Sequence, residues 1–359
     1  MIMRSTHEDA YFAASNSAKG FFSYYKECFD NSRIKHLYAI KGGPGTGKSY
    51  FLRRVARQGE ELGWKCEYIY CSSDPDSLDG VILEKEENCV ALLDATAPHV
   101  YEPSHPGVRE DIVNLGAFWD INKLTARAEE IEKLNLVKGN AYRRAYRYLC
   151  GMGETELAKE SLVSPYIRQK AIARYAEKLM SDVARGDGFS VRPALMRSVG
   201  MRGEVGFDTY FANAEEIFFI EDCRGAGQYL MAELLRLASE KQVAIRLSHD
   251  PIMPHRIDGI FFSASKRAFV VGKEKPAYPF RKISMRRFVD TAGLGAVRRQ
   301  VNYADRVSRA LLGGAIDALE DARQTHFALE EIYIAAMDFD AKEAFTKNFC
   351  QNLFDLQKK

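Results

Sequence analysis

The stretch "HLYAIKGGPGTGKSYFLRRVA", residues 36–56, predicts a strand, a glycine-rich turn and a helix in direct succession. The segment HLYAI is aliphatic and aromatic, as buried strands are. The segment after the turn places Leu52, Val55 and Ala56 on one helical face and arginines on the opposite face. Between them, GGPGTGKS at residues 42–49 fits the pattern G-x-x-x-x-G-K-[S/T], which between a strand and a helix predicts a phosphate-binding loop, or P-loop.

Each residue type in this loop has a physical reason. Glycine accepts positive φ and lets the backbone approach an anion, so that successive amide groups point inward. The helix that follows adds the partial positive charge of its N-terminus. Lys48 would reach the β- and γ-phosphates, and the Ser49 hydroxyl would ligate Mg²⁺. The predicted nucleotide-binding residues are Gly42, Gly43, Pro44, Gly45, Thr46, Gly47, Lys48 and Ser49.

A second apolar run, CVALLDATAPH at residues 89–99, delivers one carboxylate, Asp94. We expect Asp94 to join Ser49 on Mg²⁺, as a carboxylate at the end of a buried strand does in P-loop proteins. The alternative is an aspartate that only caps the next turn. The next residue is Ala95, so the glutamate that many ATPases carry there must be replaced from elsewhere. The chain has no Asn-Lys-x-Asp and no Asp-x-x-Gly that begins at Asp94, which favours ATP over GTP.

The chain contains a second copy of this pattern. Three segments match in order: residues 36–56 with 216–236, residues 71–83 with 247–262, and residues 88–100 with 266–278. A common order of strand, glycine turn, helix, strand, Asp-Pro loop and strand predicts two similar α/β units. The alternative is two unrelated α/β domains with similar turns.

The second copy has lost the residues that a nucleotide needs. The aligned pairs are Gly42 with Asp222, Lys48 with Gln228, Ser49 with Tyr229, and Asp94 with Gly272. The turn glycines remain, and Asp222 would repel a triphosphate. We therefore interpret the second half as a pseudo-site with a structural or regulatory role.

The same comparison selects candidate catalytic residues besides Lys48. The loop SSDPDSLDG, residues 72–80, follows an apolar strand, and we expect it at the sheet edge where α/β proteins bind ligands. Asp74 and Asp79 recur in the second half, but Asp76 is replaced there by Ile252. Asp76 is therefore the preferred candidate for holding a water or an acceptor, with ordinary turn chemistry as the alternative.

Two further candidates are basic. His99 is replaced by Ala277 in the second half, which favours a role as a general base or phosphate contact over that of a polar loop residue. Arg143 and Arg147 share one face of a predicted helix and are candidates for an arginine finger. The alternative for this pair is a solvated basic face.

Composition restricts the class of protein and its partners. The chain has 359 residues, 46% of them hydrophobic, a net charge of +2 and seven scattered cysteines. These values predict a globular cytoplasmic protein of about two domains with reduced thiols, and they favour neither a membrane nor a nucleic-acid partner. We expect a P-loop domain at residues 1–185 and a degenerate repeat at residues 190–359, each ending in helices, with a boundary in residues 184–190.

The motifs IKGGPGTGKS, CSSDPDSLDG, LLDATAPH, NLGAFWD and AYRYL resemble those of an uncharacterised bacterial family of tandem P-loop ATPase-like proteins. EEIYIAAMDF near the C-terminus resembles the closing helical hairpin of that family. The resemblance covers nearly the whole chain and implies ATP binding and hydrolysis. The family commonly carries a P-loop in its second half too, and this sequence departs from that pattern at residues 222–229.

These observations predict an α/β protein with tandem P-loop NTPase-type domains and mostly parallel sheets. The expected function is that of a magnesium-dependent ATPase, with ATP bound only in the first half. A small-molecule or nucleotide kinase, and a non-catalytic scaffold switched by nucleotide, remain as alternatives.

Overall fold

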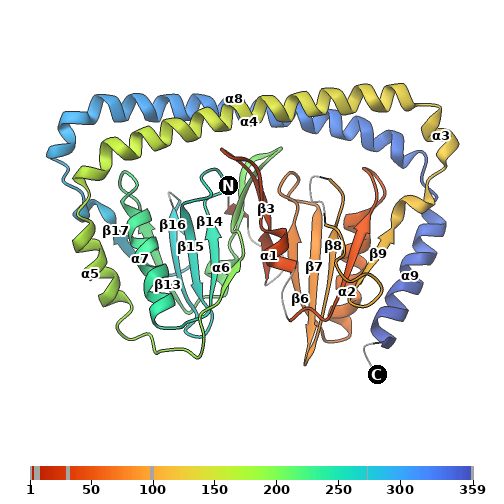
Figure 1. Cartoon of the computed structure of the whole chain (residues 1–359), viewed down its shortest axis with the longest axis horizontal. Helices are drawn as coiled ribbons and strands as arrows, with labels where there is room; N and C mark the ends of the chain where they lie inside the picture. Colours follow the sequence, from red (N-terminus) through yellow and green to blue (C-terminus); the bar gives the residue numbers. More distant parts are fainter. Residues whose placement is uncertain (1, 4–8, 30–32, 98–100, 273, 357–359) are drawn as a thin grey trace.

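The computed structural model describes residues 2–3, 9–29, 33–97, 101–272 and 274–356. Two six-stranded sheets stand side by side, with helices on their outer sides and two long helices that run across both (Figure 1). This arrangement is α/β with two mixed, mostly parallel sheets and helices after each, as the sequence predicts at that level.

The two sheets have the same strand order. The first consists, in spatial order, of β2 (Ala10–Phe12), β6 (Lys65–Tyr70), β7 (Leu78–Lys85), β8 (Asn88–Asp94), β5 (His36–Lys41) and β9 (Glu110–Asn114). The second consists of β10 (Val191–Pro193), β14 (Ile245–His249), β15 (Ile257–Phe262), β16 (Arg267–Gly272), β13 (Glu216–Glu221) and β17 (Arg281–Ser284). Each strand of the first sheet therefore has a counterpart at the same place in the second, as a structural repeat requires.

One strand in each sheet is reversed. Strand β7 pairs antiparallel with both β6 and β8, and β15 does so with β14 and β16. The reason is local: only Glu86 and Glu87 separate β7 from β8, and so short a connection allows only a hairpin. The loop predicted at residues 72–80 is shorter than expected, because β7 begins at Leu78 and already includes Asp79.

Two short strands and a short helix precede β5 in the first half and β13 in the second. They are β3 (Ala14–Ser17), β4 (Gly20–Ser23) and α1 (Tyr25–Phe29) in the first half, and β11 (Arg197–Gly200), β12 (Gly203–Phe207) and α6 (Thr209–Ala212) in the second. Strand β12 also pairs with β1 (Ile2–Met3). The remaining short elements are α3 (Ile121–Thr125) and the 3-10 helices η1 (Leu115–Phe118), η2 (Ser164–Tyr166), η3 (Met285–Phe288) and η4 (Gly293–Val297).

The two long helices are α4 (Ala128–Val163) and α8 (Arg298–Ile334). Each has enough residues to extend about 54 Å, which carries the chain from one sheet to the other. Ion pairs of Arg144 with Asp321 and of Lys159 with Asp305 show that they run antiparallel (Figure 1). Side chains of both helices share one buried cluster, which includes Ala145, Leu149, Ala315, Ala318 and Leu319.

As a result, the two halves exchange their last helices. Helix α5 (Gln169–Leu179) follows α4 but packs on the second sheet, next to α7 (Ala226–Glu240). Helix α9 (Phe339–Leu356) follows α8 but packs on the first sheet, next to α2 (Lys48–Glu61). The predicted boundary at residues 184–190 lies between α5 and β10, so a cut there would separate α5 from the sheet that it covers.

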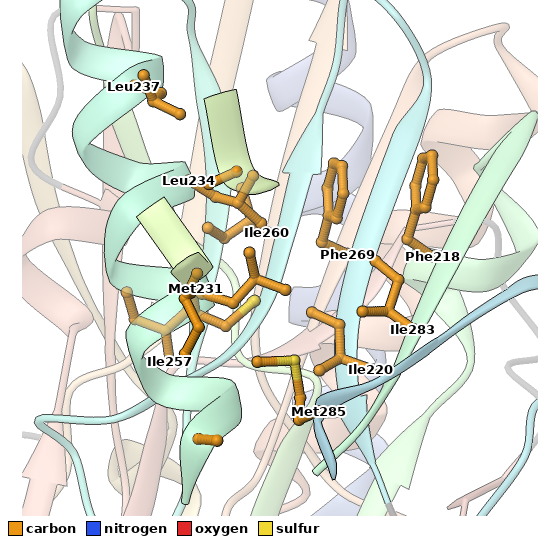
Figure 2. Close-up of a cluster of buried hydrophobic side chains, with 14 of the residues drawn as sticks. Phe218, Ile220, Met231, Leu234, Leu237, Ile257, Ile260, Phe269, Ile283 and Met285 are labelled. Carbon is orange, nitrogen blue, oxygen red and sulfur yellow. The ribbon is translucent and has the colours of Figure 1, made fainter. Parts of the chain in front are cut away.

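The buried apolar cluster of each half includes the helix that it receives from the other half. In the second half, Met231, Leu234 and Leu237 of α7 point toward Ile260 of β15 and Phe269 of β16 (Figure 2). Ile172 and Ala176 of α5 belong to the same buried cluster. The corresponding cluster of the first half contains Phe51, Leu52 and Val55 of α2 together with Leu353 and Phe354 of α9.

The inner faces of the two sheets share a third cluster, which includes Tyr11, Leu37, Ile82, Tyr210 and Phe261. At its edge lies Asp9, which is 3% exposed and bonds Arg246 of β14 at 2.7 Å and Lys65 of β6 at 3.1 Å. Burial alone would raise the pKa of Asp9, but these two cations lower it to about 2. No helix in the described part of the chain is apolar and long enough to span a bilayer.

We predict that Asp9→Asn lowers the free energy of unfolding by about 2 kcal/mol at pH 7, since the pKa is 3.8 in the unfolded chain and about 2 in the folded protein. A lowered carboxyl pKa stabilises the fold above pH 3.8 and ceases to do so as the pH falls toward 2. The difference between wild type and variant in urea unfolding should therefore vanish in acid. The exposed Asp317→Asn is the control, and a difference independent of pH would contradict this assignment.

Candidate functional site

The first glycine loop, residues 42–49, joins β5 to α2. Gly45 and Gly47 have φ of 67° and 73°, in the left-handed region that glycine tolerates best. Helix α2 begins at Lys48, directly after Gly47. The loop thus places backbone amide groups and a helix N-terminus at the carboxyl edge of the first sheet, an arrangement suited to an anion.

Lys48 and Asp94 meet across this loop. The ammonium group of Lys48 donates to the carbonyl oxygens of Gly42 at 2.8 Å and Gly43 at 2.9 Å. It lies 3.6 Å from the carboxylate of Asp94, which ends β8 beside β5. Burial raises the pKa of Asp94, and the charge of Lys48 opposes that shift. The two residues predicted to act on phosphate and metal are therefore neighbours.

The residues present fit a hydrated magnesium ion. The Ser49 hydroxyl accepts a hydrogen bond from the Leu78 amide at 2.9 Å, which fixes its position next to β7. The negative charge of Asp79 contributes to the raised pKa of Asp94, so a second carboxylate stands nearby. Hydroxyl and carboxylate oxygens are the hard ligands that Mg²⁺ prefers, with water and phosphate oxygens in its other positions. Ser49 and Asp94 would hold the ion.

The structure separates Asp76 from this group. Its carboxylate is largely exposed and pairs with Arg202 of the second half, and its carbonyl accepts from Arg53. Asp74 also lies 3.6 Å from Arg202, and its charge acts on two residues over the glycine loop, His326 and Glu330. Asp74 is therefore the aspartate of the loop nearer to the candidate site, and a role for Asp76 stays a prediction.

The structure does not place the three basic candidates, His99, Arg143 and Arg147, at this site. His99 lies outside the described residues. Arg143 and Arg147 are both exposed, and Arg143 donates to Asn140 within its own helix. The face of α4 that turns to the first sheet carries Tyr142 instead, whose hydroxyl donates to Ser73 at 3.3 Å.

Each half holds the Asp-Pro loop of the other half through a backbone hydrogen bond. The Met201 amide, in the turn of the β11–β12 hairpin, donates to the Ser73 carbonyl at 2.9 Å. The Ala18 amide, in the turn of the β3–β4 hairpin, donates to the Ile252 carbonyl at 2.9 Å. The Asp-Pro loops at both sites are thus positioned by the opposite half of the chain.

Helix α8 covers the first glycine loop. A Cβ atom on Gly45 would meet the Glu330 carbonyl oxygen and an Ile334 side-chain carbon, both at 2.9 Å, so only glycine fits there. Burial raises the pKa of Glu330, while a hydrogen bond from the Gly45 amide and the charge of Lys48 lower it. A carboxylate from the second half therefore contacts the loop that is predicted to bind phosphate.

Cations and carboxylates lie together around this loop. Burial lowers the pKa of Lys138 on α4, and the positive charge of Lys48 lowers it further. Burial also lowers the pKa of His326 to about 4, with Lys138 and Lys48 acting in the same direction. His326 is therefore neutral at pH 7, and the charged groups beside it include Lys48, Lys138, Asp74 and Glu330.

Helix α9 contributes a third lysine. Lys342 is only 3% exposed, and a Cβ atom on Gly47 would stand 2.6 Å from its ammonium nitrogen. This nitrogen lies over the rings of Tyr50 at 4.7 Å and Phe339 at 5.5 Å. Among the described residues, no carboxylate lies within 4.0 Å of it. Burial lowers the pKa of Lys342.

The second glycine loop, residues 222–229, is filled by its own side chain. The Asp222 carboxylate accepts from the Gly225 amide at 2.8 Å and the Gly227 amide at 2.7 Å. Helix α7 begins at Ala226, two positions earlier than α2 does in the first half, and Gly227 lies within it. The expected repulsion by Asp222 thus takes a specific form, since its carboxylate occupies the position that an anion would need.

The structure changes the sequence alignment of the two halves at two positions. The register of β13 on β16 places Val271 opposite Ile220, where Asp94 stands opposite Ile40 in the first half. Val271, rather than Gly272, is therefore the counterpart of Asp94, and the second site lacks this carboxylate in either alignment. Gln228 bonds the backbone of Ile257, as Ser49 bonds that of Leu78.

No protein-family profile, curated protein or solved structure matches this chain. The candidate site thus has to be judged by its own geometry.

Four residues over the first loop were absent from the sequence prediction: Lys138, His326, Glu330 and Lys342. Lys138 and Lys342 could have been found by aligning the helical segments of the two halves at a different offset from that of the glycine loops. Backbone pairing joins Trp119 to Met337 and Val289 to Ile167, which relates the helical segments by 170 positions. At that offset Lys138 aligns with Ser308, and Lys342 aligns with Ile172.

We predict that Asp222→Ala lowers the free energy of unfolding by about 1–2 kcal/mol, because the amides of Gly225 and Gly227 lose a charged capping partner. Inorganic phosphate should stabilise this variant more than wild type, because the variant gains a second loop with unbonded amides, and urea unfolding with and without phosphate would measure this difference. Asp187→Ala, in an exposed turn, is the matched control. Equal stability of Asp222→Ala and wild type would contradict the described role of Asp222.

Proposed function

We propose that the chain is a magnesium-dependent ATPase with P-loop NTPase-type domains and one working nucleotide site, in the first half. The main support is Lys48, which begins a helix directly after two left-handed glycines and lies 3.6 Å from Asp94. A lysine and a carboxylate in this relation to a helix N-terminus suit the γ-phosphate and its metal ion. The filled second loop supports a single site.

The proposed reaction is hydrolysis of ATP. A water molecule attacks the γ-phosphorus, the bond from this phosphorus to the β–γ bridging oxygen breaks, and ADP and inorganic phosphate leave. Lys48 would neutralise charge on the β- and γ-phosphate oxygens, and Ser49 and Asp94 would hold the metal ion. When bound, Mg²⁺ supplies charge neutralisation to the same oxygens.

We assign the positioning of the attacking water to Glu330. Ala95 stands where many ATPases carry a glutamate, so the carboxylate must come from another element. Glu330 is partly buried, contacts the Gly45 amide and feels the charge of Lys48. An incoming phosphate would take over the Gly45 amide, which leaves the carboxylate free to bind water.

Lys48→Met should weaken Mg-ATP binding by about tenfold or more and lower phosphate release by about a hundredfold, because a charge-assisted contact is lost. Gln228→Met, at the same position in the second loop, should change neither. Calorimetric titration measures affinity and stoichiometry together, and wild type should bind one Mg-ATP per chain. Failure of wild type to bind, or binding of two, would refute the proposal.

Glu330→Gln should lower turnover by about a hundredfold while Mg-ATP affinity is kept or increased, since a negative charge near the phosphates is removed. Glu331→Gln, on the exposed side of the same helix, is the control. Single-turnover assays with γ-labelled ATP would follow the product. Label that ends on a small molecule rather than in free phosphate would instead support the phosphotransferase alternative.

A further inference from the structure

The clearest unexplained group in the described structure is the ammonium group of Lys342. It is buried at the N-terminal end of α9, with two aromatic rings beside it and no carboxylate within ion-pair distance among the described residues. A buried charge without a counterion is costly, so proteins pair such groups or use them to bind a ligand of opposite charge. The surroundings of Lys342 therefore suggest an anion.

The position of Lys342 indicates which anion. Its nitrogen stands against Gly47, the last glycine before Lys48, and over the ring of Tyr50, which follows Ser49. These residues flank the helix N-terminus where the phosphate chain of a nucleotide would lie. The ammonium group is thus next to the proposed phosphate site but enters it from the other half of the chain.

The second half of the molecule provides an internal comparison. At the 170-position offset that relates α5 to α9, the residue in place of Lys342 is Ile172, which is fully buried in the apolar cluster of the second sheet. An aliphatic residue is therefore what this position carries where the glycine loop is filled by Asp222. The lysine occurs only opposite the loop that keeps Lys48.

The same contrast holds for Lys138. Its counterpart is Ser308, whose hydroxyl donates to Glu156 at 2.9 Å in the second half. The three lysines at the first site are Lys48, Lys138 and Lys342, and they correspond to Gln228 in the sequence alignment, Ser308 and Ile172 at the second. All three cations are present at the loop that has no carboxylate of its own, and all three are absent at the loop that Asp222 fills.

We propose that Lys342 binds the phosphate groups of the nucleotide held by the first glycine loop, so that the C-terminal half completes the site of the N-terminal half. This inference rests on the proposed nucleotide-binding function. It also gives the exchanged helix α9 a chemical role: it carries a cation to a site that the first sheet alone would leave incomplete.

The test combines two measurements on Lys342→Met that should move in opposite directions. Without nucleotide, the variant should be more stable than wild type in thermal unfolding, because an unpaired buried cation is replaced by an apolar side chain. Its affinity for Mg-ATP should fall by about ten- to a hundredfold, since one charge-assisted contact is lost. Lys342→Arg, which keeps the charge, should recover part of the affinity.

Lys347→Met, an exposed lysine of the same helix, is the matched control and should match wild type in both measurements. If wild type binds Mg-ATP and Lys48→Met does not, but Lys342→Met binds as wild type does, the role of Lys342 is refuted while the proposed function stands. If Lys342→Met is destabilised or does not fold, the lysine is structural and the inference fails. If wild type binds no nucleotide, it is the proposed function that fails.

Discussion

Helices α4 and α8 pack antiparallel through a buried cluster that includes Ala145, Ala315 and Ala318, and this contact decides where the rest of the chain lies. Each helix spans the distance between the sheets, so each delivers its successor, α5 or α9, to the opposite half. The hairpin turns also reach across the molecule. The turns at Ala18 and Met201 each bond the Asp-Pro loop of the other half. Neither candidate site is therefore made by one half alone.

Because α5 and α9 are exchanged, two sheets with the same strand order can carry two different sites. Both sheets have the same strand order, and a glycine loop follows the strand next to one edge, β5 or β13. In the second half, Asp222 bonds the amides of its own loop and Ile172 completes an apolar layer. In the first half, the Gly45 amide bonds Glu330 of the opposite half, which an incoming phosphate would displace, and Lys48, Lys138 and Lys342 lie near the loop. The second half thus acts as a stable partner that supplies α8 and α9 to the first.

The sequence predicts the parts of this structure that depend on short-range patterns. The strand, loop and helix around residues 36–56, their repeat at residues 216–236, and the helical segments all follow from apolar periodicity and glycine spacing. The proximity of Lys48 to Asp94 follows as well, because adjacent parallel strands end at one edge. The filling of the second loop was foreseen only as repulsion by Asp222, since its hydrogen bonds depend on a helix that starts two residues early.

Long-range contacts account for what the sequence does not predict. An amphipathic helix has an apolar face wherever it packs, so its pattern cannot tell which sheet α5 or α9 covers. Asp76 was favoured because the second half lacks it, yet the structure pairs it with Arg202, a partner 126 positions away. Lys138 and Lys342 have no counterpart lysine in the second half. That difference is visible only when the helices are aligned at an offset of 170 positions, and not at the 180-position offset of the glycine loops.

Hydrogen–deuterium exchange with and without Mg-ATP tests most directly whether the nucleotide site is shared between the halves. The account predicts that Mg-ATP slows exchange at residues 42–49 and, to a similar extent, at the end of α8 and the start of α9, residues 326–346. The second glycine loop, residues 222–229, should not change. Protection confined to the first sheet and α2, with α8 and α9 unaffected, would contradict it.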